Sequence, residues 1–204
     1  MGEIREPMKK SSIEKKNKII EKGFELICNN GYYNVNCCDI AKYAGVSTGI
    51  IYQYFKDKKD IFILGVKNYA NNIMFPMIDI LDNTHIDIDN LENILNKMLD
   101  SFIKTHKISK KAHEELMAMS HIDKEIGEIF ADGEIKMANK IVKVLKYNNF
   151  NEKDINENVH IIIGLIDKFC HEVVYHQHKN INYDVMKKKI IEITLSLINK
   201  KTTD

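Results

Sequence analysis

The sequence predicts an all-α fold of about nine helices. Only 2 prolines and 9 glycines occur among 204 residues, so few positions force the backbone out of a helix. Apolar residues recur every three or four positions over most of the chain, which is the period of an amphipathic helix, and no strong run alternates apolar with polar residues as a half-buried strand would. The helices divide into a small N-terminal group and a larger body.

The N-terminal group begins with one longer helix. Residues 1–12 are expected to form a flexible basic arm. The helix should start near Ser11 and Ser12 and end before Gly31, where the apolar period stops. Its inward-facing side chains are Ile19, Ile20, Phe24 and Ile27. This helix would support the two short helices that follow.

Residues 36–55 predict two short helices joined by a tight turn. Asn36 is a good N-cap, and Asp39 places a carboxylate in the first turn, where the helix dipole favours it. Gly45 can end this helix in the left-handed conformation, and Ser47 can cap the next one. On the second helix Ile51 and Phe55 should face inward, and Tyr54 should sit beside an outward-facing set. That set is Thr48, Gly49, Tyr52 and Gln53. This layout is typical of a helix-turn-helix, whose second helix enters the DNA major groove.

The same segment resembles the DNA-binding domain of the TetR family of bacterial repressors, over about residues 13–72. The residues that carry the resemblance are Gly31, Tyr32, Asn36, Ile40, Ala41, Ala44, Gly45, Val46, Ser47, Gly49, Tyr52, Tyr54, Phe55 and Lys58. The family usually has Ser or Thr where Asn36 stands, and an aliphatic residue where Cys37 stands. A packed three-helix unit with no role in DNA binding is the alternative interpretation.

The resemblance implies a set of DNA contacts. Thr48, Gly49 and Tyr52 would meet bases or adjacent phosphates, and Gln53 lies on the same exposed face. Tyr54 and Lys58 would anchor phosphates, while Asn36 and Cys37 would hold a phosphate at the start of the first motif helix. The predicted DNA-binding residues are therefore Asn36, Cys37, Thr48, Gly49, Tyr52, Gln53, Tyr54 and Lys58.

The body, residues 73–204, is expected to bind an effector and to dimerise. A linking helix should run from about Lys58 to Leu81 with a kink at Pro76, followed by an amphipathic helix over 91–103. Ser109 can cap a short helix, and a long helix should span 123–147. The last two helices, near 154–177 and 184–200, are rich in Ile, Leu and Val, and the family architecture implies that they form the homodimer interface.

The region between the linking helix and the dimer helices would form the effector pocket. Its candidate lining residues are Phe102, His106, His113, Met117, His121, Phe130, Met137 and Phe169. These side chains would suit an apolar or aromatic small molecule. A stripe of Met and Phe at helical spacing also fits an ordinary core.

One polar stripe stands out on the helix predicted near 154–177. Its members follow steps of three and four residues, so they share one helix face: Glu157, His160, Gly164, Asp167, His171, Tyr175 and His178. His160, Asp167 and His171 are weak candidates for a metal site, or for a protonation switch. We favour the alternative that the stripe faces solvent or is satisfied across the dimer.

Composition agrees with a DNA-binding regulator. Residues 1–60 hold 11 Lys and Arg against 8 Asp and Glu, and residues 61–204 hold 19 against 21, a mildly basic head on a mildly acidic body. The sequence contains no segment typical of a membrane span or a signal peptide. Its four cysteines lack metal-site spacing. Together these features predict a cytoplasmic protein with reduced thiols. Cys37 and Cys38 at a helix N-terminus leave a redox role open.

No complete catalytic motif or phosphate-binding loop appears, so neither an enzyme nor a cofactor is expected. The predicted function is a transcriptional repressor that a small molecule releases from double-stranded operator DNA. An architectural or partner-regulated DNA-binding protein without such an effector is the alternative.

Overall fold

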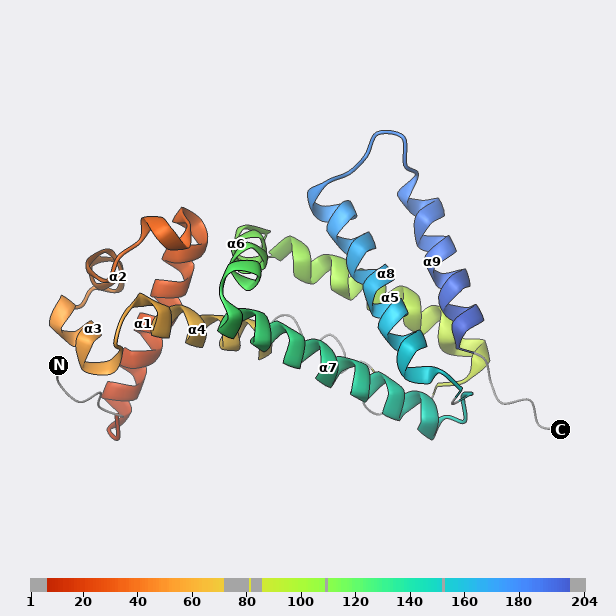
Figure 1. Ribbon diagram of the computed structural model, residues 1–204, viewed down its shortest axis with the longest axis horizontal. Helices are drawn as coiled ribbons and strands as arrows, with labels where there is room; N and C mark the ends of the chain where they lie inside the picture. The colour runs from red at the N-terminus through yellow and green to blue at the C-terminus, as the bar shows by residue number, and fades with distance from the viewer. Residues whose placement is uncertain (1–6, 72–80, 82–85, 109, 152, 199–204) are drawn as a thin grey trace. The chain divides into compact units, whose positions relative to one another are not determined.

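The computed structural model describes residues 7–71, 81, 86–108, 110–151 and 153–198. These residues carry nine α-helices and one short 3-10 helix, which confirms the all-α fold. The chain forms two compact units (Figure 1). The first contains residues up to 72 together with 111–130, and the second contains 73–110 and 131–204.

The first unit is a bundle around α1 (Lys10–Asn30). η1 (Tyr32–Asn34), α2 (Cys37–Ala44), α3 (Thr48–Tyr54) and α4 (Lys58–Tyr69) follow in order, and α6 (Lys110–Ile122) contributes most of its residues. The helix α1 packs against both α2 and α4, and α2 packs against α3 (Figure 1). The fully buried side chains of this bundle include Ile19, Ile27, Ile40, Ile51, Phe55, Ile61 and Phe62. Burial of large apolar side chains on every helix fixes the angle at which α3 is presented.

A partly buried contact of Lys58 fastens α4 to the segment before α2. The Lys58 ammonium donates hydrogen bonds to the backbone oxygens of Tyr32, at 2.6 Å, and Val35, at 2.8 Å. It also lies 4.4 Å from the centre of the Tyr32 ring. The lysine therefore satisfies the carbonyl groups of Tyr32, in η1, and of Val35, just after it.

Replacing Lys58 with methionine should lower the free energy of unfolding by about 1–2 kcal/mol, because both carbonyl groups lose a charged donor. Chemical denaturation measures the change. Lys56→Met is the matched control, since that neighbouring lysine is exposed and its side chain makes none of these contacts. Equal stability of the two variants would show that Lys58 does not hold the segment.

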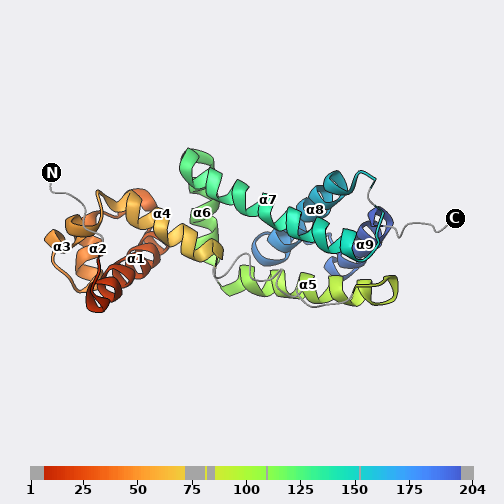
Figure 2. The ribbon, with the colours of Figure 1, turned by 90° about the horizontal axis from the view of Figure 1, so that it is seen from below.

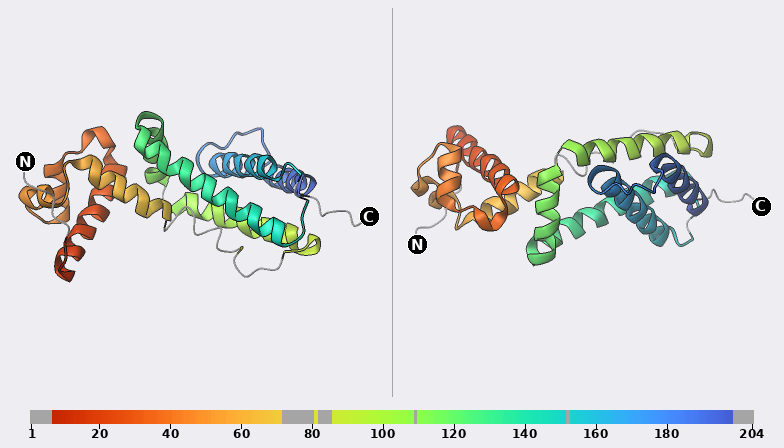
Figure 3. Two further views of the ribbon diagram at one scale, coloured as in Figure 1. Left: turned by 60° about the horizontal axis from the view of Figure 1, so that its bottom comes forward. Right: turned by 90° about the horizontal axis from the view of Figure 1, so that it is seen from above.

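The second unit is built on a helical hairpin. α8 (Ile155–Tyr175) and α9 (Tyr183–Leu197) run antiparallel (Figure 1), and α5 (Ile88–Ile108) packs against both (Figure 2). α7 (Lys124–Tyr147) contributes its residues from 131 onward, and its apolar side chains share a core with those of α5 and α8. Figure 3 shows these helices from two further sides. The core is almost wholly aliphatic, with Phe102, Phe150 and Phe169 as its buried phenylalanines.

Most sequence-based boundaries are close to those of the structure. The amphipathic helix predicted over 91–103 is α5, and the two final helices are α8 and α9. The Pro76 kink and the Ser109 cap lie outside the described residues. The division at residue 72 stays a prediction, and residues 111–130 cluster with the N-terminal helices.

Candidate functional site

The first motif helix has the cap that the sequence predicts. The Asn36 side-chain oxygen accepts hydrogen bonds from the backbone N–H groups of Cys38, at 2.8 Å, and Asp39, at 3.1 Å. The Asp39 carboxylate accepts from the Asn36 N–H at 2.9 Å, which completes a capping box. Asparagine therefore caps α2 well in the place where the family usually has Ser or Thr.

The turn between α2 and α3 has the expected glycine geometry. Gly45 lies in the left-handed region, with φ of 69° and ψ of 38°, which favours glycine over residues with a Cβ atom. Ser47 stands at the N-cap position of α3, but its side chain makes no capping hydrogen bond, so that part of the prediction is wrong. The Ser47 backbone oxygen instead begins the helix by accepting from Ile50 N–H at 3.0 Å.

The outward face of α3 carries four of the eight predicted DNA-binding residues. Tyr52 is 54% exposed and Gly49 is exposed, while Thr48 and Gln53 are half-buried. Ile51 and Phe55 are buried, as predicted. The face therefore offers hydroxyl, amide and aromatic groups, which can bond base edges and phosphates.

Tyr54 differs from the expectation that it would sit beside this exposed set. Only 7% of the residue is exposed, and its ring packs edge-on against Phe55, with ring centres 6.4 Å apart. The helix turns Tyr54 toward the core because it follows the buried Ile51 by three positions. Its phosphate contact stays a prediction, as does that of Lys58, whose ammonium already binds two backbone carbonyls.

Cys37 and Tyr52 lie together at the junction of α2 and α3. Cys37 is buried, and burial raises the pKa of its thiol. Cys37 in turn raises the pKa of Tyr52, through its charge when ionised and through their hydrogen bond. Both groups are therefore protonated and uncharged at neutral pH.

The four cysteines should react very unequally with a thiol reagent. Cys38 is exposed, whereas burial raises the pKa of Cys28 and of Cys170 to about 12 and also raises that of Cys37. We expect one fast reaction per native chain at pH near 8 and its loss in Cys38→Ser, measured by alkylation and mass spectrometry. Fast labelling of Cys37 would contradict this assignment. The redox role stays a prediction, and Cys38 is the exposed thiol of the pair.

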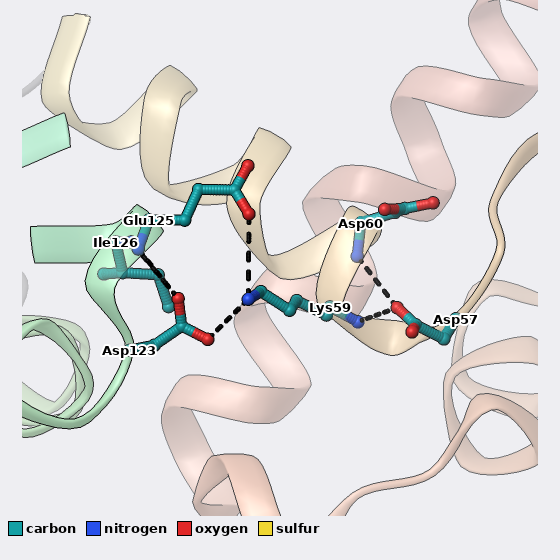
Figure 4. Close-up of polar contacts among 6 residues, drawn as sticks. All are labelled: Asp57, Lys59, Asp60, Asp123, Glu125 and Ile126. Carbon is teal, nitrogen blue, oxygen red and sulfur yellow. Dashed lines mark hydrogen bonds and ion pairs between the residues drawn. The ribbon is translucent and has the colours of Figure 1, made fainter. Parts of the chain in front are cut away.

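An ion pair joins the start of α4 to the turn between α6 and α7, within the first unit (Figure 4). The Lys59 ammonium lies 2.6 Å from the Asp123 carboxylate and 3.7 Å from that of Glu125. Hydrogen bonding to Lys59 lowers the pKa of Asp123, and the same contact raises the pKa of Lys59. A second contact in this unit links Tyr32 N–H to the Glu115 carboxylate at 2.6 Å. Carboxylates of the α6–α7 segment thus bind η1 and the start of α4.

The described residues of the second unit enclose an apolar cavity of about 50 Å³. Its walls come mainly from α5, α7 and α8, and every lining side chain is aliphatic, a methionine or a phenylalanine. Phe102 and Met137 from the predicted effector set line it. Phe169 and His106 are buried in the same unit but are not among the lining residues. The other predicted effector residues belong to the first unit, and one of them, His121, is exposed. These other residues are His113, Met117, His121 and Phe130.

The polar stripe on α8 divides into two parts. His160 is largely exposed and lies 3.3 Å from Glu134 on α7. Asp167 and His171 lie 3.5 Å apart, which is the pairing that their spacing allows. Burial lowers the pKa of His171, and the neighbouring Asp167 opposes that shift. His160 therefore does not join the other two metal candidates.

Comparisons with known proteins agree with this geometry. Residues 19–63 match the model of the family described as bacterial regulatory proteins, tetR family. The HTH-type transcriptional regulator HbdR of Aromatoleum sp. (strain CIB) is 47% identical over 55 residues, which is 27% of this chain and 24% of that protein, so the match spans about a quarter of the relative. No helix of the described residues is long and apolar enough to cross a membrane.

Two further similarities extend over nearly the whole chain. The fatty acid metabolism regulator protein of Bacillus subtilis (strain 168) is 25% identical over 193 residues, covering 90% of this chain and 95% of that protein. A crystal structure assigned to the TetR family of transcriptional regulators, from Mesorhizobium loti MAFF303099, has a TM-score of 0.74. It is 15% identical and covers 94% of this chain and 100% of that one, which supports the shared fold.

Proposed function

This chain belongs to the TetR family of bacterial regulatory proteins, and on that premise we propose that it is a dimeric repressor that an apolar effector releases from its operator. The observation that carries the proposal is the face of α3, where Tyr52 and Gly49 are exposed while Ile51 and Phe55 hold the helix on the bundle. DNA-binding transcriptional regulation is the function that this family shares. The repressor role, the dimer and the effector are the proposed parts.

Exposed apolar side chains on α8 and α9 support dimerisation. Ile161 on α8 is 51% exposed, and Val185 and Ile193 on α9 are exposed as well. Three large aliphatic side chains on a single hairpin are more than isolated surface positions require, and a partner chain would remove them from water. A symmetric dimer also presents two copies of α3, which suits operator half-sites about 34–36 Å apart.

The cavity of the second unit supports an effector that is mainly hydrocarbon. None of its described lining residues has a hydrogen-bonding side chain, so a polar molecule would lose its bonds to water there without replacement from them. A volume of about 50 Å³ is far below the roughly 300–1,000 Å³ of typical ligand sites. An effector chain must therefore displace side chains of α5, α7 and α8 as it enters, and this displacement is the proposed switch. The Bacillus subtilis relative is described as a regulator of fatty acid metabolism, so a long acyl chain is the proposed class.

Release needs only a modest difference in effector affinity between the two states of the dimer. A coupling free energy of about 1–3 kcal/mol changes operator affinity by roughly 5- to 150-fold. The small size of the cavity keeps the alternative, a DNA-binding protein without a small-molecule effector, as the second candidate.

The two candidates are separated by a titration of the protein–operator complex with oleate and with oleoyl-CoA, using coenzyme A alone as the head-group control. The proposed function predicts release by one or both acyl compounds and none by coenzyme A. Val144→Phe adds a ring to the cavity wall and should abolish that response while leaving operator binding intact. Stable operator complexes at saturating oleate and oleoyl-CoA would favour the second candidate.

A further inference from the structure

Three side chains with metal-binding atoms meet between α5 and α8 in the second unit. His106 lies on α5, and Asp167 and His171 lie one helical turn apart on α8. The Asp167 carboxylate oxygen lies 3.5 Å from Nε2 of His171 and 4.0 Å from Nε2 of His106. Ring nitrogens of the two histidines lie within 4.8 Å of one another. The Asp167 carboxylate thus lies within 4.0 Å of a ring nitrogen of each imidazole.

A hydrogen bond fixes which nitrogen of His106 faces that point. Nδ1 of His106 lies 2.8 Å from the backbone oxygen of Phe102, and a carbonyl oxygen can only accept, so Nδ1 carries the proton of this bond. In the neutral ring Nε2 then presents its lone pair toward Asp167. Metal-binding histidines are commonly oriented in this way, by an outer bond from the second ring nitrogen to a backbone carbonyl.

The surroundings hold the two helices in register at this point. The Tyr175 hydroxyl donates to the backbone oxygen of His106 at 3.0 Å, which ties α8 to α5. The Tyr175 ring packs edge-on against His171, with ring centres 5.5 Å apart. His106 is only 4% exposed, whereas Asp167 is 53% exposed, so the cluster is walled on the α5 side and reachable from solvent at Asp167.

The distances suit a transition-metal ion. Metal–ligand bonds of about 2.0–2.2 Å place two ligand atoms at most about 4.0–4.4 Å apart. Both distances to the Asp167 oxygen are within this limit, and the histidine nitrogens, which lie within 4.8 Å of one another, would move closer to share an ion. A set of two imidazoles and one carboxylate favours Zn²⁺, Ni²⁺ or Fe²⁺ over Mg²⁺ or Ca²⁺, and it leaves coordination positions open.

We propose that His106, Asp167 and His171 form a binding site for a divalent transition metal. A cation at the centre would bind the two lone pairs and the carboxylate together. The spacing along the sequence groups His160 with Asp167 and His171. In the structure His106, on α5, lies beside these two residues instead. Metal binding can be measured without DNA and without an effector, so its test does not depend on the proposed function.

The test is a titration of the full-length, chelator-treated protein with Co²⁺, followed by the d–d absorption bands of the bound ion. We expect one site per chain in the wild type. His171→Ala and Asp167→Asn should weaken binding by more than the roughly 10–100-fold that loss of an outer-shell partner costs. His160→Ala is the matched control on the same helix and should bind as the wild type does.

Circular dichroism and thermal melting without metal verify that each variant is folded. His171 and Asp167 are partly exposed, so the test does not depend on substituting the buried His106. Absence of new absorption bands with wild-type protein would overturn the proposal. Equal Co²⁺ affinity in the wild type and in both His171→Ala and Asp167→Asn would overturn it too, and so would loss of binding in His160→Ala.

Discussion

Replacing Tyr52 with alanine should weaken operator binding by about 1–3 kcal/mol, or roughly 5- to 150-fold, the usual range for a lost base contact. The side chain is 54% exposed on α3 and contributes little to the core of the bundle. Its loss should therefore leave the unfolding transition nearly unchanged. The expected signature is a fall in affinity for the operator with much less change on unrelated DNA, because base contacts carry specificity.

Fluorescence anisotropy with labelled operator and non-operator duplexes, at a fixed salt concentration, measures both affinities. Tyr147→Ala is the matched control, since Tyr147 is an exposed tyrosine at the end of α7, in the other unit. Equal operator affinity in the wild type and Tyr52→Ala would remove Tyr52 from the base contacts. Equal losses on both duplexes would make it a phosphate contact instead.

Replacing Gly65 with alanine should lower the free energy of unfolding by about 1–3 kcal/mol, the usual cost of overpacking a core. A Cβ atom at Gly65 would lie 2.5–2.7 Å from carbon atoms of Phe24 on α1. One of these is the Phe24 Cβ, which side-chain rotation cannot move. The two helices would have to separate, and this cost outweighs the roughly 0.5–1 kcal/mol that alanine gains over glycine within a helix.

Urea denaturation followed by circular dichroism gives the stability change. Gly49→Ala is the matched control within the same unit, because the nearest atom to its new Cβ would be the Ser47 hydroxyl at 3.9 Å. That variant should be as stable as the wild type or slightly more stable, while it obstructs the approach of DNA to α3. If Gly65→Ala were as stable as Gly49→Ala, the result would contradict the close packing of α1 on α4 at Gly65.

Local signals explain why the helix-turn-helix could be predicted from sequence. The capping box at Asn36 and the left-handed Gly45 depend on residues within a few positions of each other, and both are present in the structure. The buried side of α3 also followed from its helical period. Tyr54 was misplaced because a tyrosine suits either an exposed or a buried position, and its contact with Phe55 decides between them.

Contacts between distant segments could not be predicted in this way. The bonds from Lys58 to Tyr32 and Val35 join residues more than twenty positions apart, and nothing in their spacing indicates them. Likewise, the polar stripe on α8 correctly paired Asp167 with His171, but only packing against α5 brings His106 to them. The effector residues were the least predictable, since core and cavity walls share one apolar pattern.

The most direct test of the central assignment is footprinting of the purified protein on the DNA upstream of its own gene, in parallel with the Tyr52→Ala variant. We predict a protected stretch containing two half-sites separated by about one helical turn, or 34–36 Å. The variant should lose that protection at the same protein concentration. Uniform background cleavage with the folded wild-type protein on this region and on randomly selected duplexes would contradict operator binding by α3.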